Sequence, residues 1–234
     1  ACLMAALPEY YSQLGEAWLS VGWLEIEGTS ISSSTVSRKG NQCGSTKEYC
    51  VFGPGGNLNV AHHGGSDFYD ANENGSSYSA PMVSGIIALL AEAFPNHTPE
   101  QLVDRLLASS NNTFFTVEGY TNFVNGVKHG YSAEFGHGIP DVYVALSPIG
   151  TGNFSIGQMY VGDSLSGSPA SRSASQSSSL SYDLSSSKFN ISSSLGAQSF
   201  ISSLSNTKSY YYDSLNGGFE FNFRVLKPWE RDPA

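Results

Sequence analysis

Hydrophobic and polar positions follow two different patterns along the chain, and the change falls near residue 150. The stretch EAWLSVGWLEIEG (residues 16–28) gathers apolar residues in a short run, which predicts a strand. EYCVFGPGGNLNVA (48–61) predicts two short strands on either side of the turn Gly53–Gly56. Met82–Phe94 is apolar on every side, which predicts a helix buried in the core of a layered domain.

Two further helices are indicated by their end signals. Thr98, followed by Pro99 and Gln101, has the sequence of a capping box, so a helix is expected to begin there. FGHGIPDVYVALSPIG (135–150) predicts a glycine turn and a short last helix from Pro140 to Leu146, with Asp141 as its helix-start carboxylate. The order strand, strand, helix, helix predicts an α/β layer fold for residues 1–150.

Past Gly150 the chain becomes rich in serine, with 23 Ser in residues 151–234. Alternation of apolar and polar residues returns at 180–184, at 189–191 and most clearly in GFEFNFRVL (218–226). A period of two predicts half-buried strands. We therefore expect residues 151–234 to form a Ser-rich linker and a β-rich appendage.

Charge divides the chain at the same place. Residues 1–150 hold 5 Lys+Arg and 14 Asp+Glu, a balance of −9, whereas residues 151–234 hold 6 of each. The acidic first part argues against nucleic-acid binding, which needs a basic surface. A structural calcium ion is compatible with this charge, but no dense carboxylate loop specifies one. No run approaches the roughly 20 apolar residues that span a bilayer, so no membrane contact is expected from these residues.

The ends and the cysteines suggest a piece of a longer, exported protein. The chain opens with ACLMAALPEYY, without Met and without the basic region of a signal peptide, so we expect the protein to begin upstream. Cys43 and Cys50 lie too far apart for a typical metal pair, and no second pair is present. A short disulfide loop is favoured over two free thiols and implies an oxidising compartment. Cys2 is left over, either free and buried or paired outside the chain.

Three serines, Ser76, Ser77 and Ser79, stand at the start of the apolar helix in NENGSSYSAPMVSGIIALL (72–90). A hydroxyl at a helix N-terminus lies beside unpaired backbone N–H groups and the positive end of the helix dipole, so it is well placed for nucleophilic chemistry. The alternative is a serine that only caps a core helix and has no catalytic role. The Gly-x-Ser-x-Gly elbow of α/β-hydrolases fits poorly, because Ser79 stands where its second Gly should be.

The pattern Gly-Thr-Ser-x-Ala-x-Pro-x-Val-x-Gly around the nucleophile of subtilisin-like serine proteases fits better. Positions 75, 77, 81, 83 and 85 match it outright, with Ser76 in place of Thr and Ser79 in place of Ala. The stretch therefore resembles a subtilase nucleophile segment, and Ser77 is the matched catalytic position. In this interpretation Pro81 lies in the opening turn, and Gly85 lets a neighbouring element approach closely.

The flanking residues extend the resemblance over roughly residues 1–150. Gly53-Pro54-Gly55 is similar to the Ala-Pro-Gly turn of subtilases, with Gly53 in place of Ala, and the paired-cysteine loop before it is similar to subtilases of bacterial autotransporters. The resemblance implies a three-layer α/β fold with a mostly parallel sheet. The family's Asp, its His in a His-Gly-Thr-His context and its oxyanion Asn are not found here and are expected upstream. His62 and His63 have the wrong neighbours and order, and His129 and His137 are interpreted as loop residues without a partner.

These features predict the C-terminal part of a secreted subtilisin-like serine endopeptidase over residues 1–150, acting on a protein or peptide through Ser77 without a cofactor. The chain alone is predicted to be inactive. The alternative is a catalytically inactive surface or adhesin module whose Ser-rich strands are the working part. Beyond the chain, the resemblance allows a C-terminal outer-membrane barrel.

Overall fold

The computed structural model describes residues 4–61, 69–150, 179–183, 188–192 and 208–222. Its internal contacts divide the chain into two units, Ala1–Ile149 and Gly150–Ala234, and each is described by itself. Among the described residues, no helix has both the length and the apolar character needed to cross a membrane. His62 and His63, and Cys2, lie outside the described residues.

The first unit is built around a small sheet of three strands in the order β2-β1-β3. β1 (Ser20–Ile26) pairs in parallel with β3 (Cys50–Pro54) and antiparallel with β2 (Val36–Arg38). Of the predicted strand over 16–28, residues 20–26 are confirmed, while residues 16 and 17 belong to a 3₁₀ helix, η1 (Ser12–Ala17), which follows α1 (Leu7–Tyr10). The β1–β3 pair is the parallel pair among the described strands, and the remaining pairs are antiparallel.

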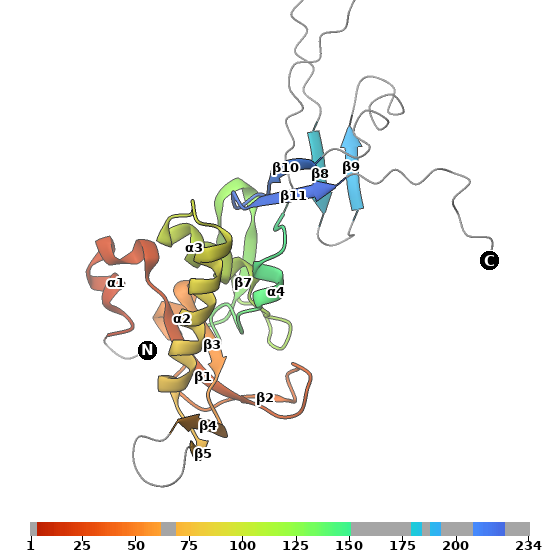
Figure 1. Ribbon diagram of the computed structural model, residues 1–234. Helices are drawn as coiled ribbons and strands as arrows, with labels where there is room; N and C mark the ends of the chain where they lie inside the picture. Colours follow the sequence, from red (N-terminus) through yellow and green to blue (C-terminus); the bar gives the residue numbers. More distant parts are fainter. Residues whose placement is uncertain (1–3, 62–68, 151–178, 184–187, 193–207, 223–234) are drawn as a thin grey trace, which may run out of the picture. The chain divides into compact units, whose positions relative to one another are not determined.

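The two long helices follow the sheet in the sequence, and Figure 1 shows them beside it. α2 (Ser76–Ala93) contacts β1, β3 and α3 (Pro99–Ser109). The capping box of α3 is confirmed, because the Thr98 hydroxyl accepts from the Gln101 N–H while the Gln101 side chain accepts from the Thr98 N–H. α4 (Val142–Ala145) begins after Asp141, whose Oδ1 accepts from the Val144 N–H at 3.0 Å, so the predicted helix-start role of Asp141 is confirmed.

Two hairpins and two short 3₁₀ helices complete the unit. β4 (Leu58–Ala61) pairs with β5 (Tyr69–Glu73), and β6 (Gly119–Asn122) pairs with β7 (Lys128–Tyr131). η2 (Gly44–Tyr49) precedes β3, and η3 (Val124–Gly126) connects β6 to β7. β3 and β4 are the two strands that the sequence predicts around the Gly53–Gly56 turn.

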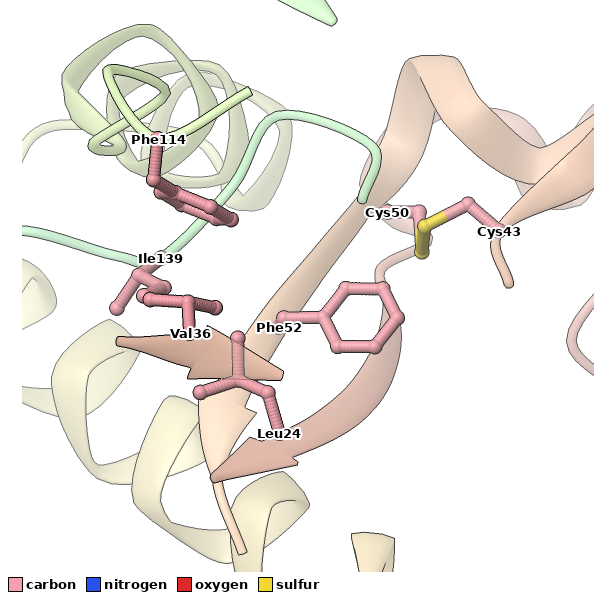
Figure 2. Packing of buried hydrophobic residues seen from close by; sticks show 7 residues of the cluster. All are labelled: Leu24, Val36, Cys43, Cys50, Phe52, Phe114 and Ile139. Atoms are coloured by element: carbon pink, nitrogen blue, oxygen red, sulfur yellow. A yellow bond between two sulfur atoms is a disulfide. The ribbon is translucent and has the colours of Figure 1, made fainter. Parts of the chain in front are cut away.

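The core lies on one side of the sheet, where buried side chains of β1, β2 and β3 meet residues far along the chain (Figure 2). Its members are Leu24, Val36, Cys43, Cys50, Phe52, Phe114 and Ile139. Phe52 and Phe114 each meet Phe135 edge-on, with ring centroids 5.7 and 5.1 Å apart. Gly22 is required beside this cluster, because a Cβ there would lie 2.5 Å from the Phe52 ring.

The predicted all-round burial of α2 is not observed. Only Ser79, Val83 and Leu90 are buried, whereas Met82 is 39% and Leu89 50% exposed. A Cβ at Gly85 would meet nothing within 4 Å, so no described element makes the close approach expected there. The described residues therefore cover one side of an apolar helix and leave the other side open to solvent.

The described part of the second unit contains two antiparallel hairpins. β8 (Ser179–Asp183) pairs with β9 (Lys188–Ser192), and β10 (Lys208–Tyr212) pairs with β11 (Gly218–Asn222). Of these strands, β8, β9 and β11 lie at the predicted alternating stretches, and β10 was not predicted. Asp213 closes the β10–β11 turn, since its Oδ1 accepts from the N–H groups of Leu215 and Gly217 at 3.0 and 2.8 Å. The predicted continuation of the last strand to residue 226 lies outside the described residues.

Candidate active site

The N-terminus of α2 presents its three serines differently. Gly75 precedes the helix with φ 147°, and the helix begins at Ser76. The side chains of Ser76 and Ser77 are exposed, whereas Ser79 is fully buried. Ser77, the second residue of the helix, therefore offers its hydroxyl to solvent beside N–H groups that have no partner within the helix.

Pro81 lies one turn deeper than the sequence suggests. It is the sixth residue of α2, not a member of the opening turn, because the helix starts at Ser76. Proline has no N–H, so it cannot donate to the carbonyl four residues earlier, which belongs to Ser77. The backbone of Ser77 is thus held less by the helix's own hydrogen bonds than its position would imply.

The glycine turn at the end of β3 packs directly against this helix start. The Gly75 N–H donates to the Gly55 carbonyl at 2.7 Å, and the Ser79 hydroxyl lies 3.1 Å from the carbonyl oxygens of both Gly53 and Pro54. The adjacent Asn74 adds a further link, since its Oδ1 accepts from the Asn57 N–H at 2.9 Å. The turn therefore contacts the chain at Gly75 and at Ser79, on both sides of Ser77.

A cavity of about 400 Å³ opens beside the helix start. It is lined by Ala5, by Ser20–Trp23 of β1, by the loop 39–43 and by Ser76. On the other flank, Tyr78 donates from its hydroxyl to the Glu73 carboxylate at 3.2 Å. Burial, together with the negative charge of Glu73, raises the pKa of Tyr78, so this phenol stays protonated and acts as a donor.

No histidine in the described part of the chain lies within hydrogen-bonding distance of the Ser77 hydroxyl. His129 and His137 instead contact each other, which corrects the expectation that they lack partners. Their Nδ1 atoms are 2.9 Å apart, and the rings stack with centroids 5.1 Å apart.

The hydrogen-bond partners of His129 and His137 indicate which ring nitrogens carry hydrogen. His129 Nε2 lies 2.8 Å from the Ser110 carbonyl oxygen, which can only accept, so it carries hydrogen. In a neutral ring the His129 Nδ1 then accepts from His137 Nδ1–H, and His137 Nε2 accepts from the Thr121 hydroxyl at 3.1 Å. With both rings neutral, His137 Nε2 carries no hydrogen for the Glu48 carbonyl oxygen 3.2 Å away, so this assignment satisfies the contacts with Ser110 and Thr121 but not the contact with Glu48.

Burial enforces that neutral state. Desolvation, followed by the effect of charge on His129, lowers the pKa of His137 to about 3, although the Glu48 carbonyl 3.2 Å from Nε2 acts in the opposite direction. Desolvation also lowers the pKa of His129. The pair connects the end of α3, the β6–β7 hairpin and η2, so its role is to hold these elements together.

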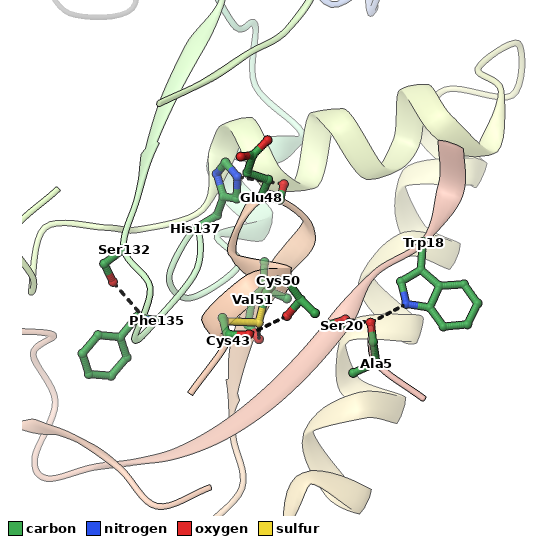
Figure 3. Close-up of a disulfide and its surroundings, with 11 residues drawn as sticks. Ala5, Trp18, Ser20, Cys43, Glu48, Cys50, Val51, Ser132, Phe135 and His137 are labelled. Carbon is green, nitrogen blue, oxygen red and sulfur yellow. Dashed lines mark hydrogen bonds between the residues drawn. A yellow bond between two sulfur atoms is a disulfide. The ribbon is translucent and has the colours of Figure 1, made fainter. Parts of the chain in front are cut away.

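The predicted disulfide between Cys43 and Cys50 is confirmed, with an S–S distance of 2.02 Å (Figure 3). The FGHG turn packs onto it: the His137 N–H donates to the Cys50 carbonyl at 2.8 Å. Gly136 has φ 56°, and a Cβ there would collide with that carbonyl and lie 2.9 Å from the Cys43 sulfur. Among the described residues no group of three or more His, Cys, Asp or Glu is arranged to hold a metal ion.

The chain thus has a mixed α/β architecture, with helices packed on a small sheet and a serine at a helix N-terminus. Residues 4–138 match the Subtilase family (Peptidase_S8), more than half of the chain, and the protein belongs to this family of serine peptidases.

The individual proteins that the chain resembles share low sequence identity with it and are matched over only part of their length. Serotype-specific antigen 1 of Mannheimia haemolytica is 31% identical over 113 residues, which cover 46% of this chain and only 11% of that protein. Fervidolysin from Fervidobacterium pennivorans, a keratinolytic enzyme related to subtilisin, is 21% identical, with a TM-score of 0.40 over 58% of this chain and 20% of its own. MycP1 from Mycobacterium smegmatis is 22% identical, with a TM-score of 0.35 over 71% of this chain and 36% of its own.

Proposed function

We propose that the protein is a subtilisin-like serine endopeptidase and that Ser77 is its nucleophile. The observation that carries the proposal is the placement of Ser77: it is exposed at the N-terminal turn of α2, it occupies the matched position of the family pattern, and its helix start is fixed to the Gly53–Gly55 turn. Ser76 is also exposed but stands at the pattern's Thr position, and Ser79 is buried.

In the proposed reaction the Ser77 Oγ attacks the scissile carbonyl of a protein or peptide and forms an acyl-enzyme, which water then hydrolyses. A histidine takes the hydroxyl proton, and the Ser77 N–H at the helix start donates to the developing oxyanion. We propose that this histidine, the aspartate that orients it and the second oxyanion donor, an asparagine, lie upstream of residue 1. No cofactor is required for acyl transfer of this kind.

The open side of α2 supports the same proposal. Met82 and Leu89 are apolar and substantially exposed, and an apolar helix of an α/β domain normally has layers on both sides. We propose that the upstream part of the domain covers this side and completes a three-layer fold with a mostly parallel sheet. In isolation the 234-residue chain should be inactive and should aggregate or pack loosely.

We also propose which part of the chain belongs to the peptidase domain and which part does not. Residues 1–150 form the C-terminal part of the peptidase domain, and residues 151–234 form a Ser-rich linker and β appendage outside the active site. The Cys43–Cys50 disulfide supports export to an oxidising compartment. A barrel beyond residue 234 that anchors the protein in an outer membrane stays a prediction.

The test is covalent labelling of the full-length protein with a fluorophosphonate, which reacts with activated serines. The wild type should be labelled at Ser77, and Ser77→Ala should abolish labelling and lower kcat by about 10⁶, because only binding and oxyanion stabilisation remain. Ser76→Ala is the matched control, since it removes an adjacent exposed hydroxyl and should retain labelling.

Two results would contradict the proposal. A folded full-length protein that takes no label and hydrolyses no peptide would be a catalytically inactive module. Stoichiometric labelling of the isolated 234-residue chain would mean that the general base lies within it, and His62 and His63 would be the residues to substitute next.

A further inference from the structure

We infer that Glu73 is a specificity-determining residue of the proposed peptidase, and that it selects substrates with Lys or Arg on one side of the scissile bond. Glu73 is the last residue of β5 and precedes Ser77 by four positions. The inference rests on the proposed role of Ser77 as nucleophile, and it adds the charge of the substrate residue that the site recognises.

A side-chain contact holds the Glu73 carboxylate at the start of α2. The Tyr78 hydroxyl donates to Glu73 Oε2 at 3.2 Å, and this contact closes a short loop of chain that contains Ser77. Tyr78 directly follows Ser77 in the helix, so the carboxylate lies within reach of a long side chain on a substrate bound at Ser77. Both Glu73 and Tyr78 are half-buried, and a half-buried charge is screened less than an exposed one.

The backbone that follows Glu73 is also fixed. Asn74 Oδ1 accepts from the Asn57 N–H at 2.9 Å, and the Gly75 N–H donates to the Gly55 carbonyl at 2.7 Å. These contacts attach the end of β5 to the glycine turn after β3. Glu73 is therefore held in place before a substrate arrives, so binding does not incur the full entropy cost of ordering it.

The charge of Glu73 is not compensated within the described residues. The ion pairs found there are those of Arg38 and Lys39 with other carboxylates, and no Lys, Arg or His side chain pairs with Glu73. Tyr78 supplies a neutral donor, because burial and the charge of Glu73 raise its pKa and keep the phenol protonated. A carboxylate in this state favours a cationic partner, and a substrate bound at Ser77 can supply one.

The other flank of the helix start differs in charge. The cavity beside Ser76 has Lys39 as the charged residue of its lining, and Lys39 Nζ is already paired with Glu25 Oε2 at 3.1 Å. A substrate that lies across Ser77 therefore meets an uncompensated carboxylate on the Glu73 flank and a compensated ion pair on the other. The preference for a basic residue should be confined to one side of the scissile bond.

The test is hydrolysis by the full-length protein of a peptide series in which Lys, Arg, Gln or Glu is placed in turn at each position next to the scissile bond. On one side, the wild type should cleave the Lys and Arg peptides with kcat/KM about fivefold or more above the Gln peptide, and the Glu peptide should be poorest. Glu73→Gln keeps an acceptor for Tyr78 but loses the charge, so the ratio of the Lys to the Gln peptide should fall to within about twofold. Rising salt should lower the wild-type ratio in the same direction.

Two further variants separate the charge from its position. Glu92→Gln is the matched control, because it removes an exposed carboxylate near the other end of α2 and should leave the ratio unaltered. Tyr78→Phe keeps the charge of Glu73 but removes the donor that holds it. Its ratio should lie between those of the wild type and Glu73→Gln.

The outcomes distinguish this inference from the proposed function. An active wild type without the preference, a preference that salt leaves unaltered, or a Glu73→Gln variant that keeps it would overturn the inference and leave the peptidase assignment intact. A wild type that cleaves no peptide and takes no fluorophosphonate would refute the proposed function, and the inference with it. Because the salt series uses the wild type alone, it decides the inference even if a Glu73 variant fails to fold.

Discussion

Acidification should destabilise the first unit through the buried His129–His137 pair. In the folded protein the pKa of His137 lies near 3, because of burial and of the neighbouring His129, against 6.5 for an unperturbed imidazole. Because the pKa is lower in the folded chain, its stabilising contribution is fully present above pH 6.5 and is lost as the pH falls. Below pH 6.5 the unfolded chain binds a proton at His137 that the folded chain does not bind. At pH 5 the loss from His137 alone is about 2 kcal/mol, from 1.36 kcal/mol per pH unit below 6.5.

Other groups titrate in the same range, so the experiment compares a variant with the wild type at two pH values. Burial and the charge of Glu100 raise the pKa of Asp104 to about 6, which works in the opposite direction as the pH falls. His137→Gln retains a donor and an acceptor but cannot be protonated. The difference in unfolding free energy between wild type and variant, measured by denaturant titration of the full-length protein, should fall by about 2 kcal/mol from pH 7.5 to pH 5.

The control is His97→Gln, because His97 contacts Phe94 with ring centroids 5.1 Å apart and lies outside the pair. Its change between the two pH values measures the contribution of a histidine outside the pair, against which the change for His137→Gln is compared. A His137 variant whose stability runs parallel to the wild type between the two pH values, or a His137 imidazole resonance that titrates near pH 6.5, would refute the reasoning.

Three other changes have expected outcomes. Asp104→Asn should stabilise the protein at pH 7.5, with the gain vanishing near pH 4, because a raised carboxyl pKa is a penalty that grows as the pH rises from 3.8 through about 6; thermal unfolding at both pH values checks this. Arg105 is fully buried and donates to the carbonyls of Ala145 and Ser147, so Arg105→Met should lower the unfolding free energy by about 3 kcal/mol in denaturant titrations. Cleavage of an active full-length protein after Gly150 should leave peptide hydrolysis within a few-fold, and a loss of several orders of magnitude in a folded product would exclude the proposed division.

Signals local in the sequence were sufficient for much of the first unit. The capping box at Thr98, the helix-start carboxylate of Asp141 and the disulfide between Cys43 and Cys50 each depend on residues a few positions apart, and each is found. The strand before Gly53 and the turn after it also follow from short-range pattern and turn chemistry.

What could not be predicted depends on residues distant in the chain. Arg105 stacks 4.1 Å from the Phe94 ring centre and reaches the carbonyls of the α4 segment about 40 positions later. His137 finds its partners in η2, β6 and β7, and no pattern around FGHG indicates them. The burial of Ser79 is likewise set by a turn 25 positions earlier. Such contacts depend on how the elements pack, which one sequence does not specify.

We expect Pro81 to divide α2 into two cooperative units of different stability, because its missing N–H interrupts the run of helical hydrogen bonds. The segment behind it is a continuous run of hydrogen bonds packed on the sheet and α3, whereas the turn before it is attached chiefly through Gly75 and Ser79. Local opening in proteins follows such boundaries, so the first turn can detach while the rest of the helix persists. Amide hydrogen exchange should therefore be faster for residues 76–80 than for residues 86–93, and the proposed nucleophile would belong to the less stable of the two units.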